Sequence, residues 1–340
     1  MASRRIPALA ANGISRRRVI TILGATAGGL TLGGGALLLG GSRELEAVEW
    51  SGVALGSPAR IALYSDDPAR ARSLLAQVAD DIHTLEDEFS LYRPGSAISR
   101  LNRTGRIDKP GREFLHLLDE SARMAELTGG AFDPTVQPIW DVTAESFRST
   151  GLPPSLDALD RLRPLVNWQG VDASSDAIRF ARPGMAVTLN GIAQGFITDR
   201  VADRLREGGL QHVLAELGET RAIGRHPDGR RWRIGIPDPD GEMLIETVQL
   251  GDEAIATSGG YGTRFDAEGK WHHIFDPATT QSAHRHRSVS VIAPTATQAD
   301  ALATAFAVMP ERAAVEVATS LPNVRVRVVD NAGVARPLGA

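Results

Sequence analysis

The sequence predicts an α+β fold: a single large domain of mixed β-sheets packed with helices, preceded by an export signal. Three observations predict it. Segments with apolar residues at helical spacing are mixed with short apolar segments typical of strands, and the two kinds do not follow a regular strand–helix–strand order. No internal repeat divides the chain. The 340 residues are 42% hydrophobic and 23% charged, an ordinary globular composition that is long enough for a large core.

The first half of the domain is predicted to be mostly helical. A strand with bends at Gly52 and Gly56 runs from residue 50 to 64. A helix opens at Asp66-Asp67-Pro68 and continues to residue 89, and Ser96 caps a short helix through residue 101. A third helix covers 112–127 and stops at Gly129-Gly130. Five prolines make 133–166 mostly irregular, with short helical pieces.

The second half is predicted to be richer in strands. Residues 185–189 form a strand that turns at Asn190-Gly191 into a helix, which buries Ile197, Val201 and Leu205. Further strands are expected at 212–217, 231–236, 244–250, 254–257, 271–275 and 288–292. A helix follows at 297–309, and a strand at 323–329 closes the chain.

Composition excludes several classes of function. The chain has no cysteine, which rules out disulfides, thiolate metal sites, iron–sulfur clusters and a cysteine nucleophile. Residues 1–42 hold five arginines and no acid, so the formal charge of −4 becomes −9 for residues 43–340. A body this acidic argues against nucleic acid as the main partner.

The N-terminus has the order of an export signal. Ser15-Arg16-Arg17-Arg18 precedes an uncharged, glycine-rich apolar run, as in twin-arginine signals. A phosphate-binding glycine loop is disfavoured there, because neither a strand nor an acidic partner frames the glycines. The run at 19–41 is just long enough to span a bilayer, and no clear cleavage site follows it. Residues 1–42 are therefore a twin-arginine signal or a retained membrane anchor, and the domain at 43–340 is expected in the periplasm.

Several polar clusters fall at the ends of predicted elements, and each alone has two interpretations. Asp133 either belongs to a site or is a turn residue. The free amides of the 190–195 turn either hold an anion at the helix start or form only a tight turn. The glycine-rich bend at 257–262 either accepts a phosphate or makes a hairpin. Asp300 and Thr304 lie four residues apart and therefore share one helix face. Either their oxygens bind Mg²⁺ there, or Asp300 is solvated and the Thr304 hydroxyl bonds to the backbone of its own helix.

The His272-His273 pair is more informative. Neighbouring residues of a strand face opposite sides, so at most one of these histidines can enter a given site. This disfavours a twin-histidine metal centre.

Taken together and in order, these clusters resemble the ApbE family of FAD:protein FMN transferases over about residues 50–315. Six motifs carry the resemblance: Phe89-Ser90-Leu91-Tyr92 with Ser99-Arg100-Leu101-Asn102, Thr128-Gly129-Gly130-Ala131-Phe132-Asp133-Pro134-Thr135-Val136, Gly191-Ile192-Ala193-Gln194-Gly195-Phe196, Ala256-Thr257-Ser258-Gly259, His273-Ile274-Phe275-Asp276-Pro277 and Ala299-Asp300-Ala301-Leu302-Ala303-Thr304-Ala305.

The resemblance implies a Mg²⁺-dependent enzyme that cleaves FAD, attaches FMN through a phosphoester to a Thr or Ser of a partner flavoprotein, and releases AMP. The residues that it places at the FAD site are Leu55, Tyr92, Ala131, Phe132, Asp133, Thr188, Gln194 and Phe275. It assigns Mg²⁺ to the carbonyl of Gly191 with Asp300 and Thr304, and makes His273 the base. A histidine suits that role because its pKa lies near neutrality.

Three positions depart from the family pattern: Thr188 replaces a frequent Asp, Gln194 replaces the usual Lys or Glu, and Ala303 replaces a residue that is acidic in some members. Fewer charges therefore surround metal and flavin. The 188–195 stretch and the export signal resemble the NosX-like subgroup, whose acceptor is the membrane protein that regulates nitrous-oxide reductase.

Two other functions fit the same motifs. One is a Mg²⁺-dependent FAD pyrophosphatase, in which water replaces the acceptor hydroxyl. The other is a non-enzymatic periplasmic flavin-binding module. The presence of both a candidate base and a candidate metal pair argues against the module, because binding alone requires no base.

Overall fold

The computed structural model describes residues 45–239 and 243–339, and its centre is one antiparallel sheet of eight strands in the order β1-β2-β6-β7-β10-β11-β12-β13. These strands are β1 (Glu46–Ala54), β2 (Ser57–Ser65), β6 (His212–Glu216), β7 (Thr220–Ile223), β10 (Ala254–Ser258), β11 (Ser288–Ala293), β12 (Arg325–Val329) and β13 (Ala335–Pro337). Two small sheets accompany it, β3-β5-β4 and β8-β9. Their strands are β3 (Arg106–Asp108), β4 (Val171–Ala173), β5 (Ala177–Phe180), β8 (Trp232–Pro237) and β9 (Leu244–Leu250).

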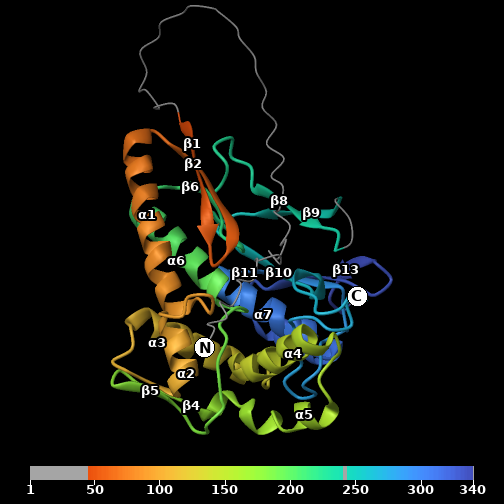
Figure 1. Cartoon of the computed structure of the whole chain (residues 1–340). Helices are drawn as coiled ribbons and strands as arrows, with labels where there is room; N and C mark the ends of the chain where they lie inside the picture. The colour runs from red at the N-terminus through yellow and green to blue at the C-terminus, as the bar shows by residue number, and fades with distance from the viewer. Residues whose placement is uncertain (1–44, 240–242, 340) are drawn as a thin grey trace, which may run out of the picture.

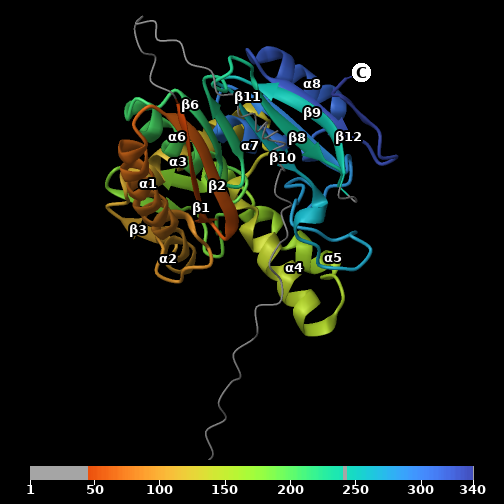
Figure 2. The same cartoon turned by 90° about the horizontal axis from the view of Figure 1, so that it is seen from above.

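Helices cover one face of the large sheet, and the β8-β9 ribbon lies on the other (Figures 1 and 2). The α-helices are α1 (Pro68–Phe89), α2 (Ala97–Thr104), α3 (Arg112–Leu127), α4 (Gln137–Thr150), α5 (Leu156–Asp160), α6 (Ala193–Glu207), α7 (Ala296–Val308) and α8 (Glu311–Ser320). Short 3₁₀ turns include η1 (Pro134–Val136) and η3 (Trp168–Gly170). Mixed helices and antiparallel strands confirm the predicted α+β fold.

The central strands are buried on both faces. In β6, Val213 and Ala215 belong to the main core with the helices, whereas Leu214 belongs to a second cluster under β8 and β9. In β10, Ala256 faces the first cluster and Ile255 the second. Because successive side chains point to opposite faces, apolar residues occur at consecutive positions, as at 213–215 of β6. Strand β11 instead alternates Ser288 and Ser290 with valines, and both serines are also buried.

Helix α1 forms where the sequence predicts it. The Asp67 carboxylate accepts the backbone N–H of Arg70 at 3.0 Å and caps the helix, while Pro68 occupies the first turn. Its apolar stripe, which includes Val78 and Ile82, is buried against the sheet and α6. The helix ends at Ser90, whose backbone is extended.

The predicted strand at 50–64 is a hairpin, β1-β2. Its turn places Leu55 and Gly56 at φ 46° and 79°, so the bend at Gly56 is the reversal of the chain. Near the C-terminus, 323–329 does not close the chain, since β13 follows β12. Helix α8 and the small β3-β5-β4 sheet are absent from the predicted elements. Helix α8 has ten residues and buries only Ala314, and each strand of the small sheet has three or four residues, so the local signals are short.

The segment 133–166 is more ordered than predicted. Prolines occupy the first turn of η1 and of α4, where no intrahelical N–H is needed, so they start these helices instead of interrupting them. With α5, α4 extends to one side of the body (Figure 2). A third cluster joins this lobe to the segment 264–276 through Ile139, Leu159 and Phe275.

Two predicted strands do not form. Residues 185–189 belong to no sheet, and the side-chain amide of Asn102 bonds both the N–H and the C=O of Val187 at 2.8 Å, as a neighbouring strand would. Residues 271–275 make only isolated bridges, which pair His272 with Arg264 and Phe275 with Ser282. The strand-based reason for separating His272 from His273 is therefore wrong.

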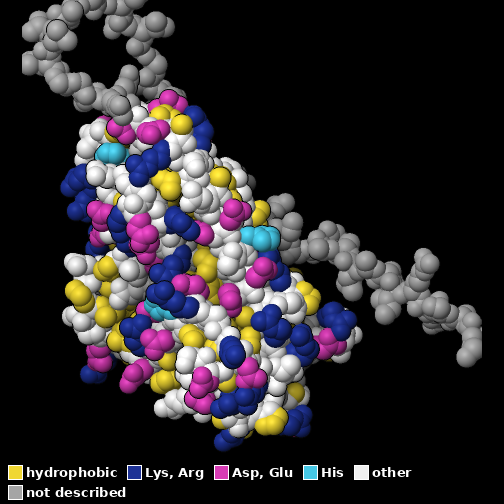
Figure 3. All heavy atoms as spheres, turned by 90° about the vertical axis from the view of Figure 1, so that its left-hand side faces the viewer, with side chains coloured by type: hydrophobic (Ala, Val, Ile, Leu, Met, Phe, Trp, Pro, Cys, Tyr) yellow, Lys and Arg dark blue, Asp and Glu magenta, His cyan; other side chains and the backbone are white. Residues whose placement is uncertain are grey.

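The predicted signal or anchor at 1–42 lies outside the described residues. Within residues 45–239 and 243–339, no helix combines the length and apolar character that crossing a bilayer requires. Figure 3 shows that the face carrying α1 and α3 has acidic and basic side chains intermixed, without a broad area of one sign.

Candidate active site

The candidate site is centred on the contact between α6 and α7. The N–H of Gly195, in the first turn of α6, donates to Oδ2 of Asp300 on α7 at 3.0 Å. A Cβ added to Gly195 would lie 2.2 Å from the carbonyl oxygen of Ala296, so only glycine permits this approach. The 190–195 turn thus meets α7 at the position of the predicted metal residues.

Three predicted metal ligands lie together. Asp300 is 3% exposed, and Thr304 lies one turn further along α7. A Cβ on Gly191 would lie 3.0 Å from the Thr304 hydroxyl and 3.4 Å from the ring of Phe132. The hydroxyl of Ser258, at the end of β10, is 3.3 Å from that of Thr304. The turn, α7 and β10 therefore surround one small region.

The position of α7 is fixed at its first turn. The Asp199 carboxylate of α6 accepts the backbone N–H groups of Ala296 and Thr297 at 2.9 and 2.8 Å. Arg221 of β7 is 3.7 Å from the same carboxylate and 9% exposed. Burial raises the pKa of Asp199, and Arg221 opposes that rise. A cavity of about 280 Å³ lies beside this pair, and none of the predicted site residues lines it.

Phe132 and Asp133 lie on the turn between α3 and η1. The Phe132 N–H donates to the Thr128 hydroxyl at 3.1 Å, and the ring is buried next to Gly191. The Asp133 carboxylate accepts the N–H and hydroxyl of Thr135, at 2.7 and 2.5 Å, and the N–H of Trp168 at 3.2 Å. Burial raises the pKa of Asp133, whereas these donors lower it. Asp133 thus caps η1 and joins it to η3, as a turn residue does, and Ala131, just before this pair, is half-buried.

Thr188 and Gln194 connect the turn to other parts of the fold. The Thr188 N–H donates to the carbonyl of Pro134 at 2.7 Å, which joins this segment to the Asp133 turn. The Gln194 side-chain amide donates to the Ser57 hydroxyl at 2.8 Å, which joins α6 to the β1-β2 turn and Leu55. Ala303, the third departure from the family pattern, is fully buried in the main core.

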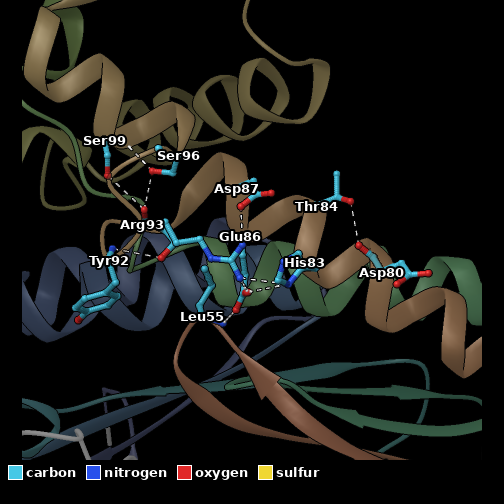
Figure 4. Close-up of polar contacts among 12 residues, drawn as sticks. Leu55, Asp80, His83, Thr84, Glu86, Asp87, Tyr92, Arg93, Ser96 and Ser99 are labelled. Carbon is cyan, nitrogen blue, oxygen red and sulfur yellow. Dashed lines mark hydrogen bonds and ion pairs between the residues drawn. The ribbon is translucent and has the colours of Figure 1, made fainter. Parts of the chain in front are cut away.

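Leu55 and Tyr92 occupy two turns that one carboxylate connects (Figure 4). Glu86 of α1 accepts the Leu55 N–H at 2.7 Å and forms an ion pair with Arg93. The Tyr92 side chain is 76% exposed.

The two histidines have different surroundings. Thr263 holds the His273 ring in either tautomer: an unprotonated Nδ1 accepts the Thr263 N–H at 3.2 Å, and a protonated Nδ1 donates to the Thr263 carbonyl oxygen at 3.3 Å. His272 is 4% exposed, and its Nε2 lies 2.8 Å from the carbonyl oxygen of Ala283. Burial, with a smaller effect of His284, lowers the pKa of His272 to about 4. His272 is therefore a neutral, structural side chain.

Phe275 belongs to the third hydrophobic cluster. It is 4% exposed, and its ring stacks on Phe265 at 6.1 Å between centroids in the third cluster. Its ring supports the segment that carries His273.

The donor set fits a Mg²⁺ ion. A buried carboxylate side chain, a hydroxyl and a turn carbonyl are all hard oxygen ligands, which Mg²⁺ prefers. No three His, Asp or Glu side chains gather into a conventional metal cluster anywhere in the described ranges.

Sequence reasoning missed three residues that contact the predicted ones, Ser57, Glu86 and Thr263, and it also missed Asp199, which holds the first turn of α7. Ser258 was part of a motif but had no role. Their partners are 10 to 137 residues away along the chain, so no local pattern marks them.

The fold and site define an α+β protein in which a glycine turn faces a buried Asp/Thr helix. The sequence profile of the ApbE family matches residues 55–328, and the chain belongs to that family. An FAD:protein FMN transferase of Haemophilus influenzae is 30% identical over 294 residues, covering 81% of this chain and 84% of that protein. One from Vibrio cholerae is 32% identical over 294 residues, covering 83% and 87%.

Solved structures agree. The flavin transferase ApbE from Vibrio cholerae superposes with a TM-score of 0.75 at 29% identity, covering 87% of this chain and 98% of that one. The ApbE protein from Thermotoga maritima gives 0.77 at 28% identity, covering 86% and 97%.

Proposed function

We propose that this chain is an FAD:protein FMN transferase, the activity for which its curated relatives are named. The observation that carries the proposal is the assembly around the α6–α7 contact. Asp300, Thr304, Gly191 and Phe132 come from three segments far apart in the sequence. Gly191 lies against Thr304 and Phe132, and Asp300 bonds Gly195 of the same turn. Chemistry on a pyrophosphate needs such a group of oxygen donors beside a substrate surface.

The FAD contacts are proposed to come from two sides. Leu55 and Tyr92 provide apolar and aromatic surface for the flavin ring, and Phe132 lies beside the turn where the phosphates would pass. The segment Ala131–Asp133, Thr188 and Gln194 are proposed to form the rest of the FAD site. The Thr188 N–H bonds the carbonyl of Pro134, and the Gln194 amide bonds the Ser57 hydroxyl. Phe275 is proposed to act indirectly, by supporting the His273 segment.

Asp300, Thr304 and the Gly191 carbonyl are proposed to hold Mg²⁺. Bound there, the ion would supply positive charge to the pyrophosphate oxygens. The Asp300 carboxylate is kept in place by the Gly195 N–H, and α7 is kept in place by Asp199. The chain thus orients its oxygens before any ligand binds.

His273 is proposed to take the proton from the acceptor hydroxyl. For Nε2 to accept it, Nδ1 must carry the hydrogen and donate to the Thr263 carbonyl, 3.3 Å away. The hydroxyl oxygen then bonds to the phosphorus on the FMN side of FAD. The P–O bond to the AMP moiety breaks, and AMP leaves. The same carbonyl stabilises the imidazolium formed.

Mass spectrometry of a candidate acceptor flavoprotein, incubated with the enzyme, FAD and Mg²⁺, tests this function. We expect one FMN attached to a Thr or Ser of the acceptor, and none when the enzyme is omitted. Release of FMN and AMP with an unmodified acceptor would instead favour a pyrophosphatase. Bound, intact FAD would favour a flavin-binding module.

We also propose that residues 1–42 direct the folded enzyme to the periplasm or hold it at the inner membrane. The support is the order of arginines and apolar residues at 15–41. An exported flavoprotein, such as the membrane regulator of nitrous-oxide reductase, would then be the acceptor. Changing Arg16 and Arg17 together to Lys should leave the protein in the cytoplasm. Recovery of that variant from the periplasm at the wild-type level would refute export through a twin-arginine signal.

A further inference from the structure

The loop at 90–95 is held by side chains along its length. The Ser90 carbonyl accepts the Ser96 hydroxyl at 2.7 Å, and the Gly95 carbonyl accepts the Arg100 guanidinium at 2.6 Å. The Tyr92 N–H lies 3.3 Å from the Ser90 hydroxyl and completes the turn (Figure 4). These contacts fix the backbone of the loop.

The Tyr92 ring is the exception within this fixed loop. It is 76% exposed, which makes it one of the few large apolar side chains that the described fold leaves in solvent. A rigid backbone that presents an exposed aromatic ring is suited to stacking on a flat ligand, because little conformational entropy is lost on binding.

The β1-β2 turn brings Leu55 to the same region. Leu55 has φ 46°, a backbone conformation that disfavours residues with a Cβ. Its N–H donates to Oε1 of Glu86 at 2.7 Å. That bond satisfies the amide in the turn and holds the turn against the C-terminal part of α1.

Glu86 also contacts the Tyr92 loop. Its second oxygen, Oε2, forms an ion pair with Nη2 of Arg93, the residue after Tyr92. The Glu86 side chain is 12% exposed, whereas Asp87, which accepts the other arm of the same guanidinium at 2.5 Å, is 65% exposed. Figure 4 shows Glu86 between Leu55 and Arg93. Both carboxylates therefore contact Arg93, but of the two, Glu86 is the one that also bonds Leu55.

We propose that Glu86 is a positioning residue of the flavin site, whose carboxylate joins the Leu55 turn to the Tyr92 loop and thereby fixes the distance between the two side chains that contact the flavin. This role rests on the proposed function, because it assumes that Leu55 and Tyr92 contact the ring. A charged carboxylate suits it, since each oxygen serves one turn and the hydrogen bond to a guanidinium is charge-assisted.

The test compares Glu86→Ala, Glu86→Gln and the control Asp87→Asn, using FAD and AMP as separate probes in calorimetric titrations. AMP lacks the flavin ring, so its affinity reports the rest of the site. For Glu86→Ala we expect the Kd for FAD to rise about tenfold and that for AMP to change less than about twofold, as when one charge-assisted hydrogen bond that preorganises a site is lost. Glu86→Gln keeps an acceptor for Leu55 and should fall between Glu86→Ala and wild type, and Asp87→Asn should match wild type.

Single-turnover transfer separates positioning from chemistry. At saturating FAD, Glu86→Gln should transfer FMN at the wild-type rate, because no group at the reacting phosphorus has changed. Unchanged FAD affinity in both Glu86 variants would overturn the role, as would an equal loss of FAD and AMP affinity, which indicates a general structural effect. If wild type binds AMP but not FAD, the proposed function itself fails.

Discussion

Replacing Gly195 with Ala should separate α6 from α7 and damage the candidate metal site. The added Cβ would lie 2.2 Å from the Ala296 carbonyl oxygen, and ordinary contact at about 3.4 Å requires the helices to move apart by about 1.2 Å. That movement strains a packed core, at about 1–3 kcal/mol. It also lengthens the bond from the Gly195 N–H to the buried Asp300 carboxylate, at about 1.5–3 kcal/mol.

The sum, about 2.5–6 kcal/mol, corresponds to a fall in Tm of about 5–12 °C at about 2 °C per kcal/mol for a domain of this size. Differential scanning calorimetry of Gly195→Ala measures it, with Gly95→Ala as the matched control, because a Cβ there meets nothing within 4 Å. The control should stay within about 1 °C of wild type. A Tm of Gly195→Ala equal to that of the control would refute the reasoning that the α6–α7 approach requires glycine.

Three further changes test other parts of the site and fold. Asp300→Asn keeps an acceptor for the Gly195 N–H but removes the charge, so FMN transfer should be lost at limiting Mg²⁺ while FAD still binds; normal turnover would place the metal elsewhere. Burial raises the pKa of Glu216 to about 7, with Arg60 opposing, so the folded state loses stability as pH rises from about 4.5 through 7. Glu216→Gln should remove that dependence, so urea unfolding at pH 8 should show the variant up to about 3 kcal/mol more stable than wild type. Plots of unfolding free energy against pH that run parallel for the two proteins would contradict it. Because the folded-state pKa of His272 is lowered to about 4, the free energy of unfolding of wild type should fall as pH decreases from about 6.5 to 4. His272→Ala should lack that contribution. If the variant loses as much stability as wild type over this pH range, this ring is not the cause.

Elements with strong local signals could be predicted from the sequence, and contacts made by tertiary structure could not. The Asp67-Pro68 start of α1 and the amphipathic pattern of α3 give their bounds almost to the residue. The strand predicted at 185–189 failed because the Val187 backbone pairs with the side chain of Asn102, 85 residues away. Proline at the start of α4 was interpreted as a breaker, although in the first turn it favours a helix.

The candidate site follows the same division. The i, i+4 spacing of Asp300 and Thr304 and the glycines of the 190–195 turn could be read locally, and the structure brings them together. Glu86 could not be identified, because its partner Leu55 lies 31 residues away in a hairpin turn. Strand alternation was expected to separate His272 from His273, but residues 271–275 make only isolated bridges and the two rings lie edge-on with centroids 6.4 Å apart. Burial of His272 is what distinguishes the two side chains.

The ratio of acceptor-bound FMN to released AMP in a single turnover tests the central claim most directly. Wild type, with FAD, Mg²⁺ and an acceptor domain bearing the target Thr, should give one attached FMN per AMP. His273→Ala should keep FAD affinity but transfer FMN about 10² to 10⁴ times more slowly, as when a positioned base is lost. AMP released without attached FMN, or transfer by His273→Ala at the wild-type rate, would contradict the account.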